Sequence, residues 1–171
     1  MSDPPNYFIL HNALISQAVL NELYRFALLL TGGSELAGRA LDAVLSDCER
    51  RIAQIRDESH RVAWLVSRIR QSCMETPAVS TEPPQEAQLS GRRGDSGSAD
   101  RGLPPDTMIL AQSFHSLPEP ERSALALFYL ELFDVEQIAQ VLGLALEELS
   151  PVLDRGRRQI ESLLNPEFFN S

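Results

Sequence analysis

Asp134–Ile160, with the sequence DVEQIAQVLGLALEELSPVLDRGRRQI, carries the clearest structural signals in the C-terminal part of this chain. Asp134 followed by Gln137 has the spacing of a capping box, which predicts that a helix begins directly after the aspartate. Apolar residues at helical spacing follow until Gly143, a residue that suits a tight turn. A second helix is expected over residues 146–164. The stretch therefore predicts a helix-turn-helix.

The second helix contains a proline, and the sequence leaves its effect open between two alternatives. If the helix begins near Leu146, Pro151 removes an interior hydrogen bond at a cost of about 3 kcal/mol. If the helix begins at Ser150, the serine is the N-cap and the proline takes the favoured first position. The residues expected to face inward are Val135, Ile138, Ala139, Leu142, Leu146, Leu149, Leu153, Gly156, Ile160 and Leu163.

The remaining apolar residues also follow helical spacing, and the predicted fold class is all-α. A helix over 107–116 and another that begins near Pro120 precede the helix-turn-helix. Three apolar stripes in the N-terminal part predict three packed helices, of which TGG at 31–33 ends the first and Trp64 anchors the third. Aromatic residues make up only 6% of the chain, and this composition favours helices over sheets.

Residues 76–105 separate two lobes. They are rich in Pro, Gly, Ser and charge and nearly lack large apolar side chains, which predicts a disordered linker. The expected organisation is a three-helix N-terminal domain at 8–75 and a helix-turn-helix domain at 106–166. Residues 106–171 carry 11 acidic residues against 4 arginines, within a total formal charge of −9. This balance conflicts with DNA binding, for which a basic surface is usual.

Several functional classes are not expected. No nucleophile-elbow, phosphate-loop or dinucleotide-binding motif occurs, so neither an enzyme nor a small-molecule substrate is predicted. Metal and cofactor sites are not expected either, since the candidate ligands lack the required spacing: His11, His60, His115, Cys48 and Cys73. The first ten residues contain no basic region before an apolar run, and the longest apolar run covers only 124–130. A cytoplasmic protein without membrane attachment is therefore expected.

Residues 116–160, SLPEPERSALALFYLELFDVEQIAQVLGLALEELSPVLDRGRRQI, resemble the promoter-binding domain of bacterial sigma factors of the extracytoplasmic-function type. The register holds without a gap from Leu117 to Ile160. The matching positions include Leu117, Pro118, Arg122, Leu125, Leu127, Tyr129, Glu136, Ile138, Ala139, Gly143, Leu153, Arg155 and Arg157. In the N-terminal part, LYRFALLLTGG, AGRALDAVL and VAWLVSRIR are similar to the polymerase-binding domain of the same family.

The resemblance implies two sets of contact residues. It assigns core RNA polymerase binding to Arg39, Leu41, Asp42 and Leu45, and DNA binding to Ser150, Arg155, Arg157 and Arg158. The sequence departs from the family at several of these positions. Where the family has Thr-Val-Lys-Ser-Arg in the reading helix, this chain has Glu148-Leu149-Ser150-Pro151-Val152, and Asp154 replaces the following histidine. The hydrophobic positions are kept, whereas the positions expected to face phosphates and bases, Val152 among them, are replaced. Glu147 and Glu148 suit the positive end of the helix dipole but would repel phosphate.

Other roles remain open for the arginines of this lobe. Arg155, Arg157 and Arg158 either contact phosphate or pair with Asp154 or Glu161 along the helix. For Arg122 the alternatives are DNA contact and an ion pair within the lobe. The partners considered for that pair are Glu121 and Glu136.

The resemblance favours a sigma factor that binds core RNA polymerase and directs promoter recognition. The alternative is a degenerate sigma mimic that acts by protein contact, by titrating an anti-sigma protein or by holding polymerase, without sequence-specific DNA binding. A third hypothesis is an unrelated helix-turn-helix regulator. The expected partners are core RNA polymerase, promoter DNA under the first hypothesis, and an anti-sigma protein.

Overall fold

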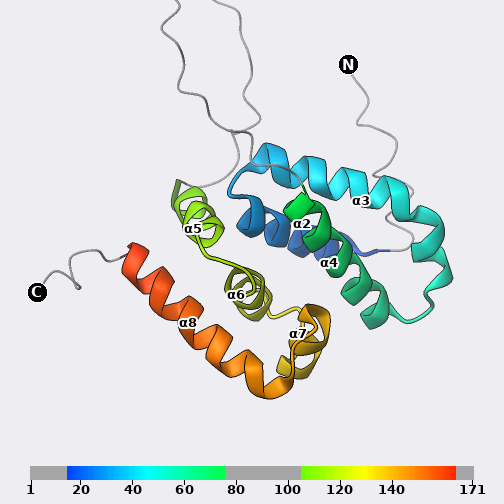
Figure 1. Ribbon diagram of the computed structural model, residues 1–171. Coiled ribbons are helices and arrows are strands. Elements are labelled where there is room, and N and C mark those ends of the chain that lie inside the picture. The colour runs from blue at the N-terminus through cyan, green and yellow to red at the C-terminus, as the bar shows by residue number, and fades with distance from the viewer. Residues whose placement is uncertain (1–14, 76–104, 165–171) are drawn as a thin grey trace, which may run out of the picture.

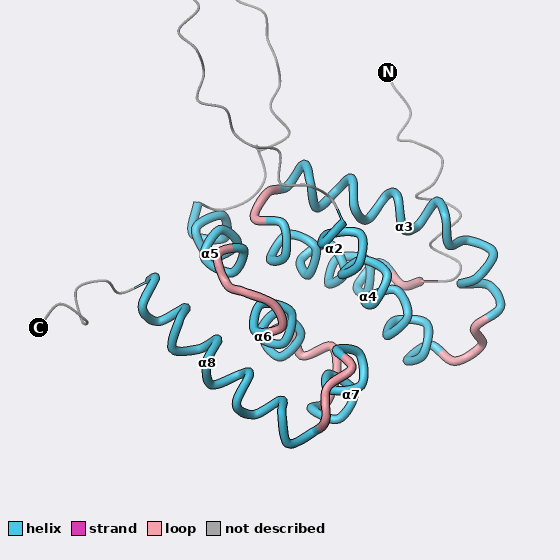
Figure 2. The backbone as a smooth tube through the Cα atoms, viewed as in Figure 1, coloured by secondary structure: helices cyan, strands magenta, loops and turns pink. Residues whose placement is uncertain are grey.

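The computed structural model describes residues 15–75 and 105–164, and within these ranges the regular structure is entirely helical (Figures 1 and 2). The helices are α2 (Gln17–Thr31), α3 (Ser34–Gln54), α4 (Glu58–Glu75), α5 (Pro105–His115), α6 (Glu121–Tyr129), α7 (Val135–Leu142) and α8 (Leu146–Leu164). The predicted all-α class is confirmed, and so are the three helices of the N-terminal part. The predicted linker lies outside the described residues, apart from its last position.

The core of the molecule is built around α2. This helix contacts α3 and α4 on one side and α5 and α6 on the other, so the two lobes share one hydrophobic core (Figure 1). Its C-terminal half is apolar on every side, as expected for a helix that is covered all round. The buried residues of α2 are Leu20, Leu23, Phe26, Ala27, Leu28, Leu29 and Leu30.

Gly32 ends α2 and lets the C-terminal lobe approach closely. Its φ of 71° lies in the left-handed region, and its N–H donates to the carbonyl of Leu28 at 2.8 Å. A Cβ atom at this position would lie 2.9 Å from the Cβ atom of His115 at the end of α5. Glycine is therefore required both by the backbone conformation and by the contact between α2 and α5.

The α7–α8 pair has the predicted local structure. The Asp134 carboxylate accepts from the Gln137 N–H at 2.8 Å, and the Gln137 side chain accepts from the Asp134 N–H at 3.1 Å. Gly143 adopts a φ of 69° after the last turn of α7. These contacts complete the capping box and the left-handed C-cap, so α7 is fixed at both ends by its own sequence.

The structure corrects the predicted packing at three apolar residues and settles where α8 begins. Val135, Leu146 and Leu163 are 46%, 49% and 49% exposed, whereas the apolar spacing placed them inside. Each lies in the first or last turn of its helix. Pro151 lies within α8, which begins at Leu146, so the alternative with Ser150 as the N-cap is wrong.

Gly156 allows α8 to pack directly against α6. A Cβ atom at this position would lie 2.6 Å from Cδ1 of Leu125 and 3.3 Å from the Cβ of Glu121. Leu125 is completely buried. The glycine therefore sets the distance between the two helices, because any side chain would overlap with the core.

Candidate functional site

The N-terminal half of α8 presents acidic and apolar groups to solvent. Glu147, Glu148, Ser150 and Pro151 are all exposed. The Glu148 carboxylate accepts from the backbone N–H of Ala145 at 2.9 Å and so satisfies one of the donors ahead of the helix. Proline has no N–H, so Pro151 leaves the carbonyl oxygen of Glu147, four residues earlier, without its usual helical hydrogen-bond donor. Such a surface attracts cations or N–H donors and repels phosphate.

The structure corrects the expected placement of the Val152 side chain. The position corresponds to an arginine in the family pattern and was expected to face outward with its neighbours. In the structure Val152 is only 4% exposed and belongs to the core, next to Leu153. An arginine here could not reach phosphate without disrupting the packing of α8.

The arginines assigned to DNA are held in different ways. The Nε atom of Arg155 lies 2.8 Å from Oε1 of the buried Glu121 on α6. Arg157 lies 4.9 Å from the ring centroid of Phe128, a distance typical of cation–π contact. Its Nη1 atom is also 3.9 Å from a carboxylate oxygen of Asp154.

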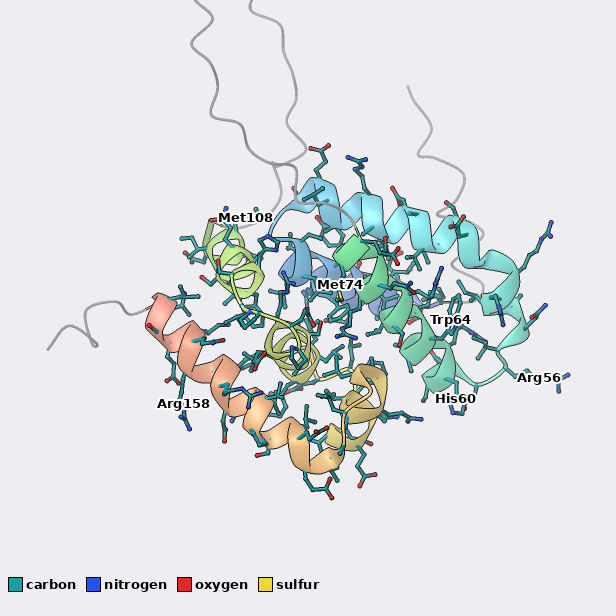
Figure 3. The ribbon with its side chains drawn as sticks, in the orientation of Figure 1. Arg56, His60, Trp64, Met74, Met108 and Arg158 are labelled. Atoms are coloured by element: carbon teal, nitrogen blue, oxygen red, sulfur yellow. The ribbon has the colours of Figure 1, made fainter. Side chains whose placement is uncertain are left out.

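Arg155 thus has a partner that the sequence did not indicate, because Glu121 belongs to another helix. Of the three arginines, Arg158 alone has no ion pair among the described residues, and it points away from the other helices (Figure 3). The side chains of Arg155 and Arg157 keep 53% and 40% exposure, so Arg158 differs from them in lacking a partner within the described residues. The fourth assigned residue, Ser150, is exposed on the acidic turn described above.

The residues assigned to polymerase binding lie on α3, where they do not form one surface. Arg39 and Asp42 are exposed, and Leu41 is half-buried. Leu45 is only 8% exposed and packs in the core. The structure leaves the two charged side chains available to a partner, while Leu45 supports the helix from inside.

A partly buried network of ion pairs and hydrogen bonds joins the lobes, and we call its residues Arg70, Glu119, Arg122, Ser123 and His115 the lobe clasp. The Glu119 carboxylate lies 3.2 Å from Nη2 of Arg70 on α4 and 3.1 Å from Nε of Arg122 on α6. Ser123 donates to Glu119 at 2.8 Å and accepts from Arg70 at 3.1 Å. The three charged side chains are between 17% and 22% exposed. Because they are paired in a shielded place, they couple more strongly than surface charges.

Arg122 and His115 of the lobe clasp bind the C-terminal end of α2. Nη1 of Arg122 donates to the carbonyl oxygens of Leu30 and His115, each at 3.2 Å. The Leu30 oxygen also lies 2.8 Å from Nδ1 of His115. A guanidinium suits the unsatisfied carbonyls and the negative end of a helix. The expected partners of Arg122, Glu121 and Glu136, are therefore wrong, and Arg122 joins the lobes through Glu119 and α2.

Cys73 lies against the lobe clasp. Burial raises the pKa of its thiol to about 12, while the Arg122 guanidinium lowers it and the Glu119 carboxylate raises it further. The thiol therefore stays protonated at neutral pH, and a protonated thiol is a poor nucleophile. Its reactivity is a direct measure of whether the lobes remain packed.

A cavity of about 370 Å³ opens between α4 and α7. Both lobes line it: α4 and the residues before it contribute Asp57, Ser59, His60, Ala63, Trp64 and Ser67, and α7 contributes Gln137, Gln140 and Val141. Trp64 is half-buried and packs against the core while it lines this cavity. Pockets of this size between packed units are common binding sites.

The described residues contain neither a metal-ligand cluster nor a membrane-spanning helix. Over 15–75 and 105–164, no three His, Cys, Asp or Glu side chains are grouped as metal ligands. None of the helices in these ranges has the length and apolar character needed to span a membrane.

The comparisons with known proteins support the fold. No protein-family model matches the sequence, and no curated protein matches it. The structure is similar to that of the sigma factor RpoE from Bartonella quintana, solved in complex with the anti-sigma factor NepR. The TM-score is 0.62 with 20% sequence identity, over 94% of this chain and 98% of that chain. At this identity the similarity establishes a sigma-factor-like fold alone.

Proposed function

We propose that the chain is a sigma-factor-like regulator of transcription that acts by contacts with other proteins, and that α8 does not read promoter DNA. The start of α8 is the observation that carries this proposal. Between Glu131 and Asp154 the sequence has six acidic residues and no basic residue, and this segment contains the whole α7–α8 turn. Phosphate contacts from cations supply most of the affinity of DNA-binding proteins, and here they are missing.

The contacts that the arginines make within the protein support the same proposal. Arg155 is committed to Glu121, and Arg157 lies over Phe128. Arg122 is used by the lobe clasp. These three side chains already have partners within the protein, and a phosphate contact would have to compete with those partners.

The proposed partners are core RNA polymerase and an anti-sigma protein. We place the proposed polymerase contact on α3, where Arg39 and Asp42 are exposed, although they replace the Asp and Gln of the family pattern. An anti-sigma protein is supported by the similar fold of a sigma factor that was solved with one. A protein with this fold and without DNA reading would release an active sigma factor by occupying its inhibitor, in the cytoplasm.

A second candidate is a working sigma factor that binds core polymerase and directs promoter recognition. The fold similarity across both lobes favours it. The exposed guanidinium of Arg158 also favours it, as one cation that could reach a phosphate.

DNA binding by the full chain separates the two candidates. We expect no measurable change in anisotropy when a labelled duplex of about 30 base pairs is titrated with the native protein at about 50 mM salt. The double variant Glu147→Lys with Ser150→Lys is expected to gain binding that weakens as salt is raised. The matched control, Glu35→Lys with Ser46→Lys, places the same charges on exposed positions of α3 and should gain much less. Native binding as tight as that of the Glu147 and Ser150 variant would contradict the proposal.

A further inference from the structure

We propose that the cavity between α4 and α7 accepts an arginine side chain of a protein partner. This inference rests on the proposed function, because it specifies the chemistry of the protein contact. The cavity is lined from both lobes and lies beside the acidic α7–α8 turn. A partner bound here would therefore touch the two lobes together.

The lining residues offer a carboxylate and an aromatic face. Asp57 is the one acidic residue of the lining, which contains no Arg or Lys. Trp64, one helical turn after His60 on α4, supplies the aromatic surface (Figure 3). A guanidinium is planar, stacks on indole rings and pairs with carboxylates through two parallel N–H donors. These two groups together select a flat organic cation.

Hydrogen-bond acceptors also remain at the cavity. Oδ1 of Asp57 accepts from the backbone N–H of His60 at 2.9 Å, and no hydrogen bond is made by Oδ2 among the described residues. Gln140 makes no side-chain hydrogen bond in the same part of the chain. A guanidinium has five N–H donors and no acceptor, so it matches these oxygens. The His60 ring lies 3.3 Å from Asp57 and can move aside, because it is 83% exposed.

The charge around the cavity argues against an anionic ligand. Glu136, next to Gln137 in the sequence, is exposed and has no ion pair among the described residues. Within the lining, a phosphate group would meet the carboxylate of Asp57 and no Arg or Lys side chain. The volume exceeds what a guanidinium alone needs, so an apolar neighbour of the arginine can pack on Ala63 and Val141. An arginine flanked by leucine is thus the expected occupant.

Trp64 is the single tryptophan of the chain and reports binding directly. The probe is the tripeptide acetyl-Leu-Arg-Leu-amide, titrated into the full-length protein while the tryptophan emission is recorded. We expect a saturable change in emission with this peptide. The citrulline peptide, which has the same shape without the charge, is expected to bind at least about tenfold more weakly, equivalent to about 1.4 kcal/mol.

Two variants test whether the peptide binds at Asp57. Asp57→Asn keeps an oxygen for the His60 N–H and removes the charge, so the fold should persist while peptide affinity falls at least about tenfold. Glu58→Gln removes the same charge from the next, exposed position and should leave affinity unchanged. Equal binding of the citrulline peptide, an unaffected Asp57→Asn protein, an equal loss in Glu58→Gln, or no emission change would each overturn the inference. The DNA titration above uses no peptide, so failure of the proposed function is recognised separately.

Discussion

Replacing Glu119 by arginine is expected to separate the two lobes while each keeps its helices. The native carboxylate lies between the guanidiniums of Arg70 and Arg122, and Ser123 donates to it. The substitution would place three guanidiniums at one partly buried point. Removal of one partner from a buried ion pair costs about 3–5 kcal/mol, and reversal of its charge adds repulsion. The contact between α4 and α6 should not survive this change.

The separation is measured by small-angle scattering and by the reactivity of Cys73 with a disulfide reagent at about pH 8. The background carries Cys48→Ser, so that Cys73 is the single thiol. In the native protein this thiol is protonated and shielded, because burial raises its pKa to about 12. We expect fast reaction and a larger radius of gyration in the Glu119→Arg protein, and a smaller effect in Glu119→Gln. Glu75→Arg, a substitution at an exposed position on α4, is the control. It should leave the reaction rate of Cys73 and the radius of gyration as they are in the native protein.

An inert thiol and an unchanged radius in Glu119→Arg would show that the lobe clasp does not hold the lobes together. The apolar contacts of α2 with α5 and α6 would then be sufficient. If Glu119→Arg fails to fold, Glu119→Gln decides the question, since it keeps hydrogen bonds and loses the charge.

Replacing Gly156 by valine is expected to destabilise the C-terminal lobe by about 3 kcal/mol. The new Cβ would lie 2.6 Å from Cδ1 and 3.0 Å from Cγ of Leu125, which is fully buried. Overpacking of a dense core typically costs about 1–3 kcal/mol, and the two methyl groups of valine place this site at the upper end. The helices α6 and α8 would have to move apart, which would also lengthen the contact of Arg155 with Glu121.

The measurement is urea unfolding followed by circular dichroism. Gly38→Val is the matched control, because a Cβ at Gly38 in α3 meets nothing within 4 Å. The control should match or slightly exceed native stability, since valine has a higher helix propensity than glycine. Equal unfolding midpoints for the two variants would contradict the assignment of Gly156 to close helix packing.

Local features of the fold were predictable from the sequence. The capping box at Asp134 and Gln137, and the left-handed glycines at 32 and 143, depend on contacts within a few residues. Helical spacing also identified the buried faces of α2, α4 and the middle of α8. These features follow from short-range geometry, which a sequence contains directly.

The candidate site was less predictable because its contacts connect distant residues. Arg70 and Glu119 are separated by 49 positions, and Arg155 and Glu121 by 34. A sequence shows many acidic residues near each arginine but does not show which helix will pass beside it. Val152 was misplaced for a related reason: the family pattern has an arginine there, whereas the packing of α8 makes the position part of the core.

The central claim, that this sigma-factor-like fold acts without reading promoters through α8, is tested most directly by reconstituted transcription. The full chain is combined with core RNA polymerase from its own cell and fragments of the same genome, and transcript start sites are mapped. We expect no discrete start site beyond those of core polymerase alone. Discrete transcripts that require the chain, and that shift when Arg158 is replaced by alanine, would contradict it.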